Sequence, residues 1–99
     1  MPTSPVVPVA IITGAGSGIG RATAAVLSSK GYSVVLVART LDALEKTAEL
    51  CPGESLCVSA DVGEPDAAVE VVDSTLARFG RIDALVNNAG IAPMLPIDK

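Results

Sequence analysis

The stretch that decides the fold is residues 9–20, VAIITGAGSGIG, in which an apolar run passes directly into a glycine-rich turn. The apolar run is typical of a buried strand, and a helical pattern over about 18–30 follows the turn. A helix N-terminus presents unpaired N–H groups and a partial positive charge, so this order of elements predicts a phosphate site. The residues at helical spacing on one face of the helix are Ile19, Thr23, Val26 and Leu27.

The spacing of the glycines separates this turn from two common nucleotide-binding motifs. The fingerprint G-x-G-x-x-G fails, because a third glycine counted from Gly14 would fall at Ile19. A P-loop fails as well, because it continues with Lys where this turn has Arg21. The pattern that fits is T-G-x-x-x-G-x-G, with glycines at positions 14, 18 and 20. A glycine-rich connection without a ligand is the alternative, and the flanking strand and helix favour phosphate binding over it.

The rest of the chain alternates short apolar runs with helical segments. The runs are apolar at nearly every position, which is typical of strands buried on both faces of a parallel sheet. Strand–helix–strand units cross over right-handedly, so the pattern predicts a doubly wound α/β fold, β-α-β-α-β-α-β, with strand order 3-2-1-4. The expected strands are residues 9–12, 34–38, 56–60 and 82–87. The two later helices are expected at 41–50 and at 65–79, the last with Val69, Val72, Leu76 and Phe79 at helical spacing.

Composition excludes several other classes of protein. A hydrophobic fraction of 49% and a mean hydropathy of +0.53 do not suit a disordered chain. The apolar run at residues 6–12 is far shorter than the roughly 20 residues of a membrane-spanning helix, and no Lys or Arg precedes it as in a signal peptide. With a net charge of −4 and scattered Lys and Arg, nucleic acid is not an expected partner.

Metal chemistry is not expected from these residues either. The sequence has no His, and Cys51 and Cys57 are too few for a metal cage. Two reduced thiols are typical of a cytoplasmic protein. The charged fraction of 18% is low for a small domain, where about 25% is average, and this indicates a partner or a larger whole.

Three short motifs follow three of the expected strands. They are TGAGSGIG at residues 13–20, Asp61-Val62, and NNAG at residues 87–90. Together they resemble the motifs of the short-chain dehydrogenase/reductase family, and the resemblance extends over residues 9–91. It implies a Rossmann-type sheet and an oxidoreductase that transfers hydride between a nicotinamide dinucleotide and a small carbonyl or alcohol substrate.

The resemblance also implies roles for these residues at the cofactor. Asp61 would accept a hydrogen bond from the adenine amino group beside Val62, with a solvated turn or helix-capping carboxylate as the alternative. Asn87 would instead tie the fourth strand to its neighbours. The pyrophosphate and adenosine would lie against Gly14, Ser17, Gly18, Ile19 and Gly20. The cleft near the adenosine and ribose would be lined by Asn88, Ala89 and Gly90.

The end of the second expected strand bears on the choice between NAD and NADP. An NAD site carries Asp or Glu there for the ribose 2′-hydroxyl, whereas this chain has Ala38 followed by Arg39. A guanidinium suits a 2′-phosphate, and no carboxylate repels it. We therefore expect NADP to be preferred, held by Arg39 with Ser17 and Thr40. An ordinary surface arginine is the alternative for Arg39, and Arg21 is expected to face solvent.

Members of this family use a Tyr with a Lys four residues later, and a Ser, for the proton transfer that accompanies hydride transfer. Tyr32 is the single tyrosine, Leu36 stands four residues after it, and we expect it at the opposite edge of the sheet. No catalytic residue is therefore assigned. Residues 1–99 are expected to be the N-terminal cofactor-binding part of one Rossmann domain, with a loose tail at 1–5 and an exposed apolar edge at 82–87. The longer parent would be a dimer or tetramer, and a non-catalytic dinucleotide-binding or sensor module or an inactive truncated product are the alternatives.

Overall fold

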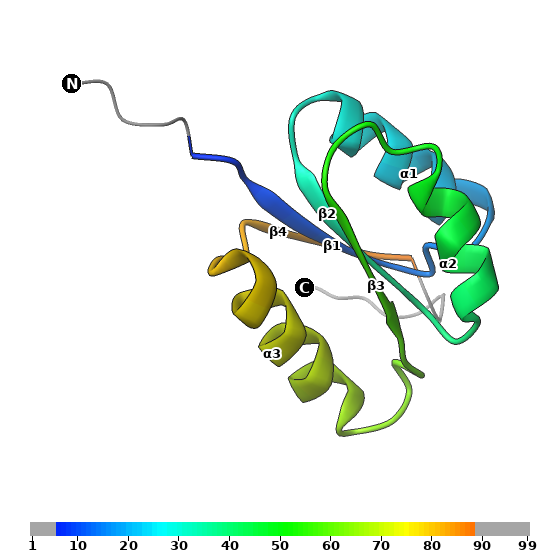
Figure 1. The fold of residues 1–99 in the computed structure, drawn as a ribbon. Coiled ribbons are helices and arrows are strands. Elements are labelled where there is room, and N and C mark those ends of the chain that lie inside the picture. Colours follow the sequence, from blue (N-terminus) through cyan, green and yellow to red (C-terminus); the bar gives the residue numbers. More distant parts are fainter. Residues whose placement is uncertain (1–5, 89–99) are drawn as a thin grey trace.

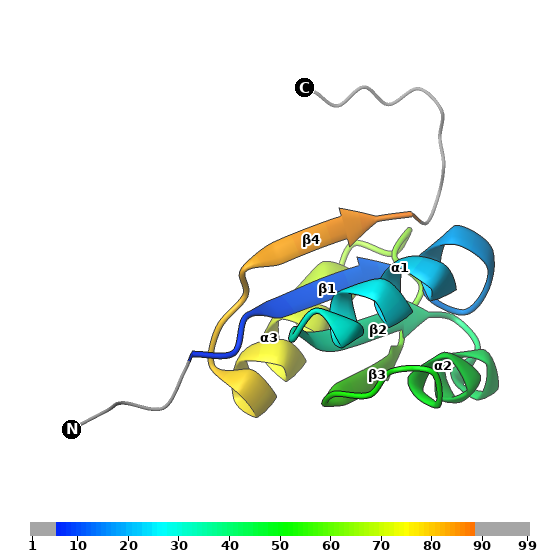
Figure 2. The same cartoon turned by 90° about the horizontal axis from the view of Figure 1, so that it is seen from above.

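Strands and helices alternate along the chain in the computed structural model, which describes residues 6–88 (Figure 1). The strands are parallel and lie in the order β3-β2-β1-β4, with α1 and α2 on one face of the sheet and α3 on the other (Figures 1 and 2). The predicted doubly wound α/β topology is confirmed, while the expectations for residues 1–5 and 89–99 lie outside the described residues. The elements are β1 (Val9–Thr13), α1 (Gly18–Ser29), β2 (Ser33–Ala38), α2 (Leu41–Ala48), β3 (Ser55–Ser59), α3 (Ala67–Phe79) and β4 (Ala84–Asn87).

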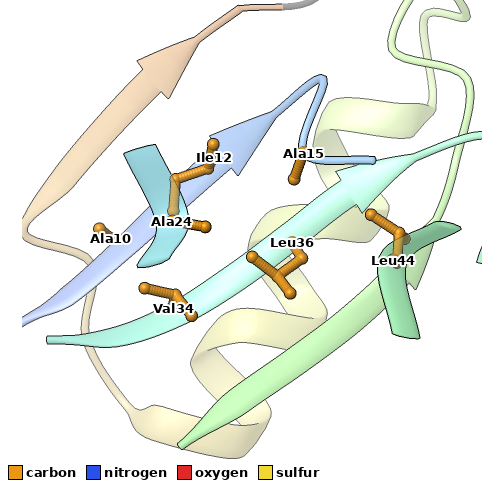
Figure 3. Packing of buried hydrophobic residues seen from close by; sticks show 7 residues of the cluster. All are labelled: Ala10, Ile12, Ala15, Ala24, Val34, Leu36 and Leu44. Atoms are coloured by element: carbon orange, nitrogen blue, oxygen red, sulfur yellow. The ribbon is translucent and has the colours of Figure 1, made fainter. Parts of the chain in front are cut away.

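The central strands β1 and β2 are buried on both faces, as their continuous apolar sequences predict. Successive side chains of a strand point to opposite faces, so each strand contributes to two cores. The core between the sheet and helices α1 and α2 (Figure 3) consists of Ala10, Ile12, Ala15, Ala24, Val34, Leu36 and Leu44. The core on the α3 side consists of Val9, Ile11, Val35, Val37, Val58 and Val71.

Helices α1 and α3 contact the sheet through smaller residues than the apolar spacing predicts. Small side chains let a helix approach a strand closely, whereas large ones hold it away. In α1 two large residues of the predicted face are turned outward, with Ile19 75% exposed and Val26 51% exposed. Leu27 of α1 and Phe79 of α3 do pack against the cores and are half-buried. In α3 the large apolar residues that are exposed are Val69, Val72 and Leu76. The buried residues are Gly20, Ala24 and Ser28 in α1 and Ala67, Val71 and Thr75 in α3.

Helix α3 begins at Ala67 rather than at Pro65, because a turn precedes it. The Glu64 N–H donates to the Asp61 carbonyl, and the Ala67 N–H donates to the Glu64 carbonyl. The helix ends at Phe79, as the sequence predicts, and Gly80 follows it with a φ of +76°, the left-handed conformation common after a helix end. Between residues 6 and 88 the structure contains no helix with the length and apolar character needed to cross a membrane.

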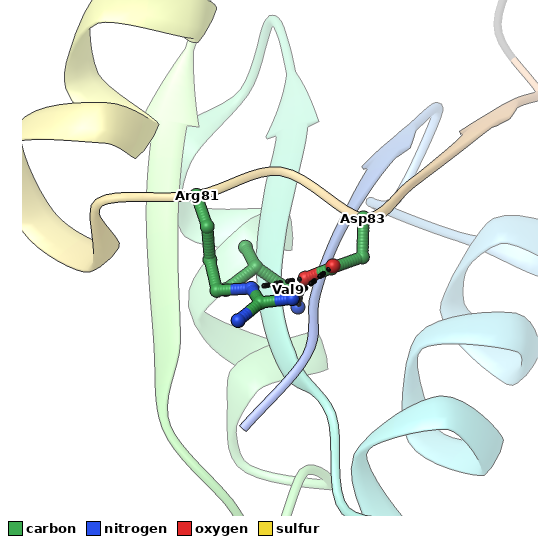
Figure 4. Close-up of polar contacts among 3 residues, drawn as sticks. All are labelled: Val9, Arg81 and Asp83. Atoms are coloured by element: carbon green, nitrogen blue, oxygen red, sulfur yellow. Dashed lines mark hydrogen bonds and ion pairs between the residues drawn. The ribbon is translucent and has the colours of Figure 1, made fainter. Parts of the chain in front are cut away.

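Strand β4 lies at the edge of the described sheet and is fastened at its start by Asp83. The Asp83 Oδ2 accepts a hydrogen bond from the Val9 N–H at 2.8 Å. Arg81 binds both carboxylate oxygens, with Nε–Oδ2 at 2.8 Å and Nη2–Oδ1 at 2.6 Å (Figure 4). The Arg81 guanidinium, followed by the Val9 N–H, lowers the pKa of Asp83 to about 2. Leu85 is 64% exposed on β4, which agrees with the expected apolar edge.

Candidate functional site

The carboxyl ends of the parallel strands meet at one edge of the sheet, and a cleft of about 780 Å³ opens there. This is the edge at which open α/β sheets bind ligands. Among the residues predicted to bind, the cleft is lined by Gly14, Arg39, Asp61 and Val62. Its lining does not include Ser17, Gly18, Ile19, Gly20, Thr40 or Asn88. The other two predicted residues, Ala89 and Gly90, lie outside the described residues.

Two glycines of the turn are needed for different reasons. Gly18 has a φ of +57°, a left-handed conformation that favours glycine, and a Cβ there would meet nothing within 4 Å. At Gly20, in contrast, a Cβ would lie 2.0 Å from the Gly14 carbonyl oxygen. Only glycine therefore lets the first turn of α1 pack against the loop, and the open space at Gly18 leaves the helix N-terminus accessible.

The backbone amides of residues 16–20 form a continuous run of unpaired donors. Within residues 6–88, no backbone or side-chain group accepts a hydrogen bond from any of them. Ser17 is the N-cap residue of α1, but its side chain makes no capping hydrogen bond, and the first turn contains no acidic residue. The partial positive charge of this helix end is therefore not compensated by the protein. Such a run of amides is suited to an anion, above all a phosphate.

Arg21 does not face solvent, so the expectation from the sequence was wrong. Its Nη2 donates to the Gly16 carbonyl at 2.6 Å and to the Ala43 carbonyl at 3.2 Å. Its Nε donates to Thr47 Oγ1 at 2.9 Å. Two of these three acceptors are backbone carbonyls that are brought together only by the folded chain, so no sequence pattern marks them. Arg21 thus joins the glycine-rich turn to α2.

Thr13, the first residue of the turn motif, connects β1 to the end of β4. Its Oγ1 donates to Asn87 Oδ1 at 2.8 Å and accepts a hydrogen bond from the Asn88 N–H at 3.0 Å. These contacts confirm the structural role predicted for Asn87 and add Thr13, to which the sequence analysis gave no role. The parallel pairing of β1 and β4 sets Thr13 opposite Asn87, so the strand order could have indicated this contact. The Asn88 Nδ2 is buried and has no acceptor within residues 6–88.

Arg39 directly follows β2 and lines the cleft with an exposed side chain. Its guanidinium forms no ion pair with any carboxylate of the described chain. The Ser59 hydroxyl on β3 donates to the Arg39 carbonyl at 2.9 Å and so anchors the backbone at this point. Ala38, which stands where an NAD site carries an acid, lines the same cleft. The end of β2 therefore offers a positive charge and no carboxylate.

Asp61 follows β3 at the same edge of the sheet. Its Oδ1 accepts a hydrogen bond from the Gly63 N–H at 2.9 Å, which makes it a turn carboxylate, the alternative weighed for this residue. The second oxygen, Oδ2, receives no hydrogen bond from residues 6–88. The turn role therefore leaves one oxygen of Asp61 available to a donor in the cleft.

The remaining chemically reactive side chains lie away from this edge. Tyr32 lies between α1 and β2, at the amino end of the sheet, and packs against the core beneath α1 and α2. Burial raises the pKa of the Cys51 thiol, and burial followed by the Glu45 carboxylate raises that of Cys57. In the described part of the chain, no group of three or more His, Cys, Asp and Glu side chains could hold a metal ion.

Comparison with known proteins identifies the family. The model of the family described as short chain dehydrogenase matches residues 8–99. The chain belongs to the short-chain dehydrogenase family. Members of this family are oxidoreductases that bind nicotinamide dinucleotides.

Several short-chain dehydrogenases resemble the chain over most of its length. The 11-beta-hydroxysteroid dehydrogenase A of Sesamum indicum is 45% identical over 95 residues, which are 92% of this chain and 27% of that protein. The crystal structure of L-sorbose reductase from Gluconobacter frateurii, complexed with NADPH and L-sorbose, has a TM-score of 0.79 and 44% identity, covering 84% of this chain and 33% of that one. An NAD⁺-bound xylitol dehydrogenase has a TM-score of 0.81 and 36% identity, covering 89% and 35%. The chain spans 25–37% of the length of the curated relatives it matches.

Proposed function

We propose that these residues are the cofactor-binding part of an NADP(H)-preferring oxidoreductase of the short-chain dehydrogenase type. The observation that carries the proposal is the sheet edge at which the unpaired amides of residues 16–20 and the unpaired guanidinium of Arg39 both lie. The amides supply donors for a pyrophosphate, and the guanidinium supplies a charged, planar partner for a 2′-phosphate.

Three details of the site support the fit of a dinucleotide. The space beside Gly18 is open, the buried Asn88 Nδ2 has no acceptor within residues 6–88, and Asp61 Oδ2 has no donor there. A buried amide nitrogen without a partner is costly, so a ligand that accepts its hydrogen bond would be stabilised. In this arrangement Asp61 and Val62 hold the adenine. The resemblance adds Ser17, Ile19, Gly20 and Thr40 on the phosphate side and Ala89 and Gly90 beside the ribose.

The preference for NADP over NAD rests on the end of β2. The solved relatives described above include both an NADPH complex and an NAD⁺ complex, so membership of the family does not decide between them. In this chain Ala38 replaces the acid that would bind a ribose 2′-hydroxyl and repel a 2′-phosphate, and Arg39 follows it. Because no carboxylate in residues 6–88 neutralises Arg39, its charge is available to the phosphate.

The chemistry supplied by the bound nicotinamide is hydride transfer to or from a carbonyl or alcohol carbon. The described residues bind and orient the cofactor, and none of them is placed to move a proton at that carbon, since Tyr32 lies at the opposite edge of the sheet. The proton transfer is assigned to a Tyr, Lys and Ser of a longer protein. By itself, the present chain is expected to bind the cofactor without turnover.

Exposed apolar residues on the α3 side of the sheet suggest a surface that other protein segments cover in the longer protein. Val72, Leu76, Ile82 and Leu85 are each between 37% and 64% exposed. Val72, Ile82 and Leu85 line the cleft, and Leu76 lies on α3 outside its lining. In the longer protein, later strands or a second copy would cover them, which fits a homo-oligomer, either a dimer or a tetramer. Neither nucleic acid nor a membrane is part of the proposal, and the expected location is the cytoplasm.

Fluorescence titration with NADPH and NADH tests the proposed cofactor. Arg39→Met removes the guanidinium, and Arg78→Met removes an exposed arginine that pairs with Glu54 on another part of the surface. Loss of a charge-assisted contact is expected to raise the Kd for NADPH about tenfold and leave that for NADH unchanged. The Arg78 variant should bind both as before. Equal affinity of the unsubstituted protein for both cofactors would overturn the NADP preference, and binding of neither would overturn the function.

The coding sequence beyond the codon for Lys99 separates the enzyme from a binding module. An open frame that encodes a Ser and a Tyr-x-x-x-Lys would support a reductase, and NADPH oxidation could then be measured with aldehydes and ketones. A stop codon, or a frame without these residues, would favour the non-catalytic dinucleotide-binding or sensor module.

A further inference from the structure

Arg21 and Thr47 form a connected set of hydrogen bonds beneath the glycine-rich turn. Arg21 reaches the Gly16 carbonyl through Nη2 at 2.6 Å and the Thr47 hydroxyl through Nε at 2.9 Å. Thr47 Oγ1 lies 2.7 Å from the Ala15 carbonyl oxygen and 3.2 Å from that of Ala43. Thr47 is fully buried in α2, so neither its position nor its partners depend on solvent.

These contacts fix the direction of the amides in the turn. The peptide group is planar and trans, so its C=O and the N–H of the next residue point in opposite directions. When Thr47 holds the Ala15 carbonyl and Arg21 holds the Gly16 carbonyl, the N–H groups of Gly16 and Ser17 must point away from α2. Those two amides begin the unpaired run at residues 16–20.

We propose that Arg21 and Thr47 are a positioning pair that sets the backbone of the glycine-rich turn for the dinucleotide. The inference rests on the proposed cofactor site, but it assigns a role to two residues that do not line the cleft. The guanidinium satisfies three acceptors at once, two of them backbone carbonyls, and it carries a positive charge beside a helix end that attracts phosphate.

Since both cofactors share the pyrophosphate, the pair acts on NADPH and NADH alike. Arg21→Met keeps much of the side-chain volume and removes every donor, and Thr47→Val removes the hydroxyl. Each change is expected to raise the Kd for both cofactors by about tenfold, in equal proportion. This distinguishes the pair from Arg39, whose loss affects NADPH alone. Because Arg21 and Thr47 share a hydrogen bond, the double variant should bind little worse than either single variant.

Conservative and matched variants separate positioning from general stability. Thr47→Ser keeps the hydroxyl and should restore the affinity lost in Thr47→Val. Thr23→Val removes a hydroxyl of α1 whose one hydrogen bond within residues 6–88 goes to the Ile19 carbonyl of its own helix, and it should leave both Kd values unchanged. Arg78→Met is the matched control for Arg21→Met, because it removes an arginine elsewhere on the surface and should leave both Kd values unchanged.

Hydrogen exchange of the ligand-free protein gives a measurement that does not depend on cofactor binding. The Ala15 N–H donates to the Val37 carbonyl at 3.1 Å and reports on the turn, whereas the Val35 N–H lies in the central sheet. In Arg21→Met and Thr47→Val, exchange at Ala15 should accelerate while Val35 stays protected. Equal acceleration at both amides, or unchanged Kd values in both variants, would overturn the inference. If the unsubstituted protein binds neither cofactor, the proposed function fails, and the exchange data still decide whether the pair orders the turn.

Discussion

A methyl group at Gly20 tests the close contact on which the glycine-rich turn depends. In Gly20→Ala the new carbon would lie 2.0 Å from the Gly14 carbonyl oxygen and 2.7 Å from the Gly14 carbonyl carbon. A nonbonded carbon and oxygen approach to about 3.3 Å, so the helix and the turn must separate by about 1.3 Å. Both obstacles are backbone atoms, and no side-chain rotation can relieve the clash.

The size of this displacement determines how much folding stability Gly20→Ala is expected to lose. Overpacking a well-packed site costs about 1–3 kcal/mol, and a backbone clash belongs at the upper end, about 3 kcal/mol. For a domain of this size, 1 kcal/mol lowers Tm by about 4–8 °C, so Gly20→Ala should lower Tm by about 12–24 °C. Moving the first turn of α1 also misplaces the unpaired amides, so most of the affinity for NADPH should be lost.

Gly80→Ala is the matched control for this experiment. Gly80 has a positive φ of +76°, which Gly20 does not have, and a Cβ at Gly80 would meet nothing within 4 Å. Its substitution should cost about 1 kcal/mol from backbone conformation alone and leave NADPH affinity intact. Thermal unfolding followed by circular dichroism, with NADPH titration of the same samples, measures both quantities. A Gly20→Ala protein that is as stable as Gly80→Ala, or that binds NADPH normally, would refute the reasoning.

Two further predictions concern the attachment of β4. Thr13→Val removes the hydroxyl that bonds to Asn87 Oδ1 and to the Asn88 N–H, so unfolding in urea should show a loss of about 1–3 kcal/mol, and an unchanged midpoint would contradict this. The pKa of Asp83 is lowered to about 2, so its ionised form stabilises the folded state above about pH 4, and that contribution is lost as the pH falls toward 2. Asp83→Asn should therefore lower Tm at pH 7, and Tm of this variant should fall less steeply between pH 4 and 2 than Tm of the unsubstituted protein. Asp73→Asn, which changes an exposed carboxylate, is the control and should show the same fall of Tm as the unsubstituted protein.

Much of the fold could be predicted because buried parallel strands have a distinctive sequence. β1 and β2 are apolar at nearly every position, and the structure buries both of their faces. The helix faces were predicted less well. Apolar spacing gives most weight to large residues such as Ile19, whereas contact between α1 and the sheet selects small ones, because Gly20 must pack against the Gly14 carbonyl. Which face a helix buries thus depends on how closely it approaches the sheet.

Some residues of the candidate site could be predicted from their position next to a strand, and others could not because their contacts form only in the folded chain. Arg39 and Asp61 could be located from the sequence, because each lies within two residues of a strand end and strand ends meet at one edge. Arg21 could not, since its acceptors are the Gly16 and Ala43 carbonyls and the Thr47 hydroxyl, which come together only when the turn and α2 are folded. Position along the chain therefore predicts which residues could contact a ligand. The residues that hold the ligand-contacting backbone in place are determined by long-range packing and have to be found in the structure.

The residues proposed to bind the cofactor can be compared with those that the reaction would require, to ask whether cofactor binding can occur without catalysis in this chain. The amides of residues 16–20, the Arg39 guanidinium and the Asp61 carboxylate all belong to β1, β2, β3 and the segments that directly follow them. Their positions are fixed by the cores on the two faces of the sheet. A proton donor for the substrate is not among them. If the cores suffice to order the turn, NADPH should bind without being oxidised, and binding should not require the residues that carry out the proton transfer.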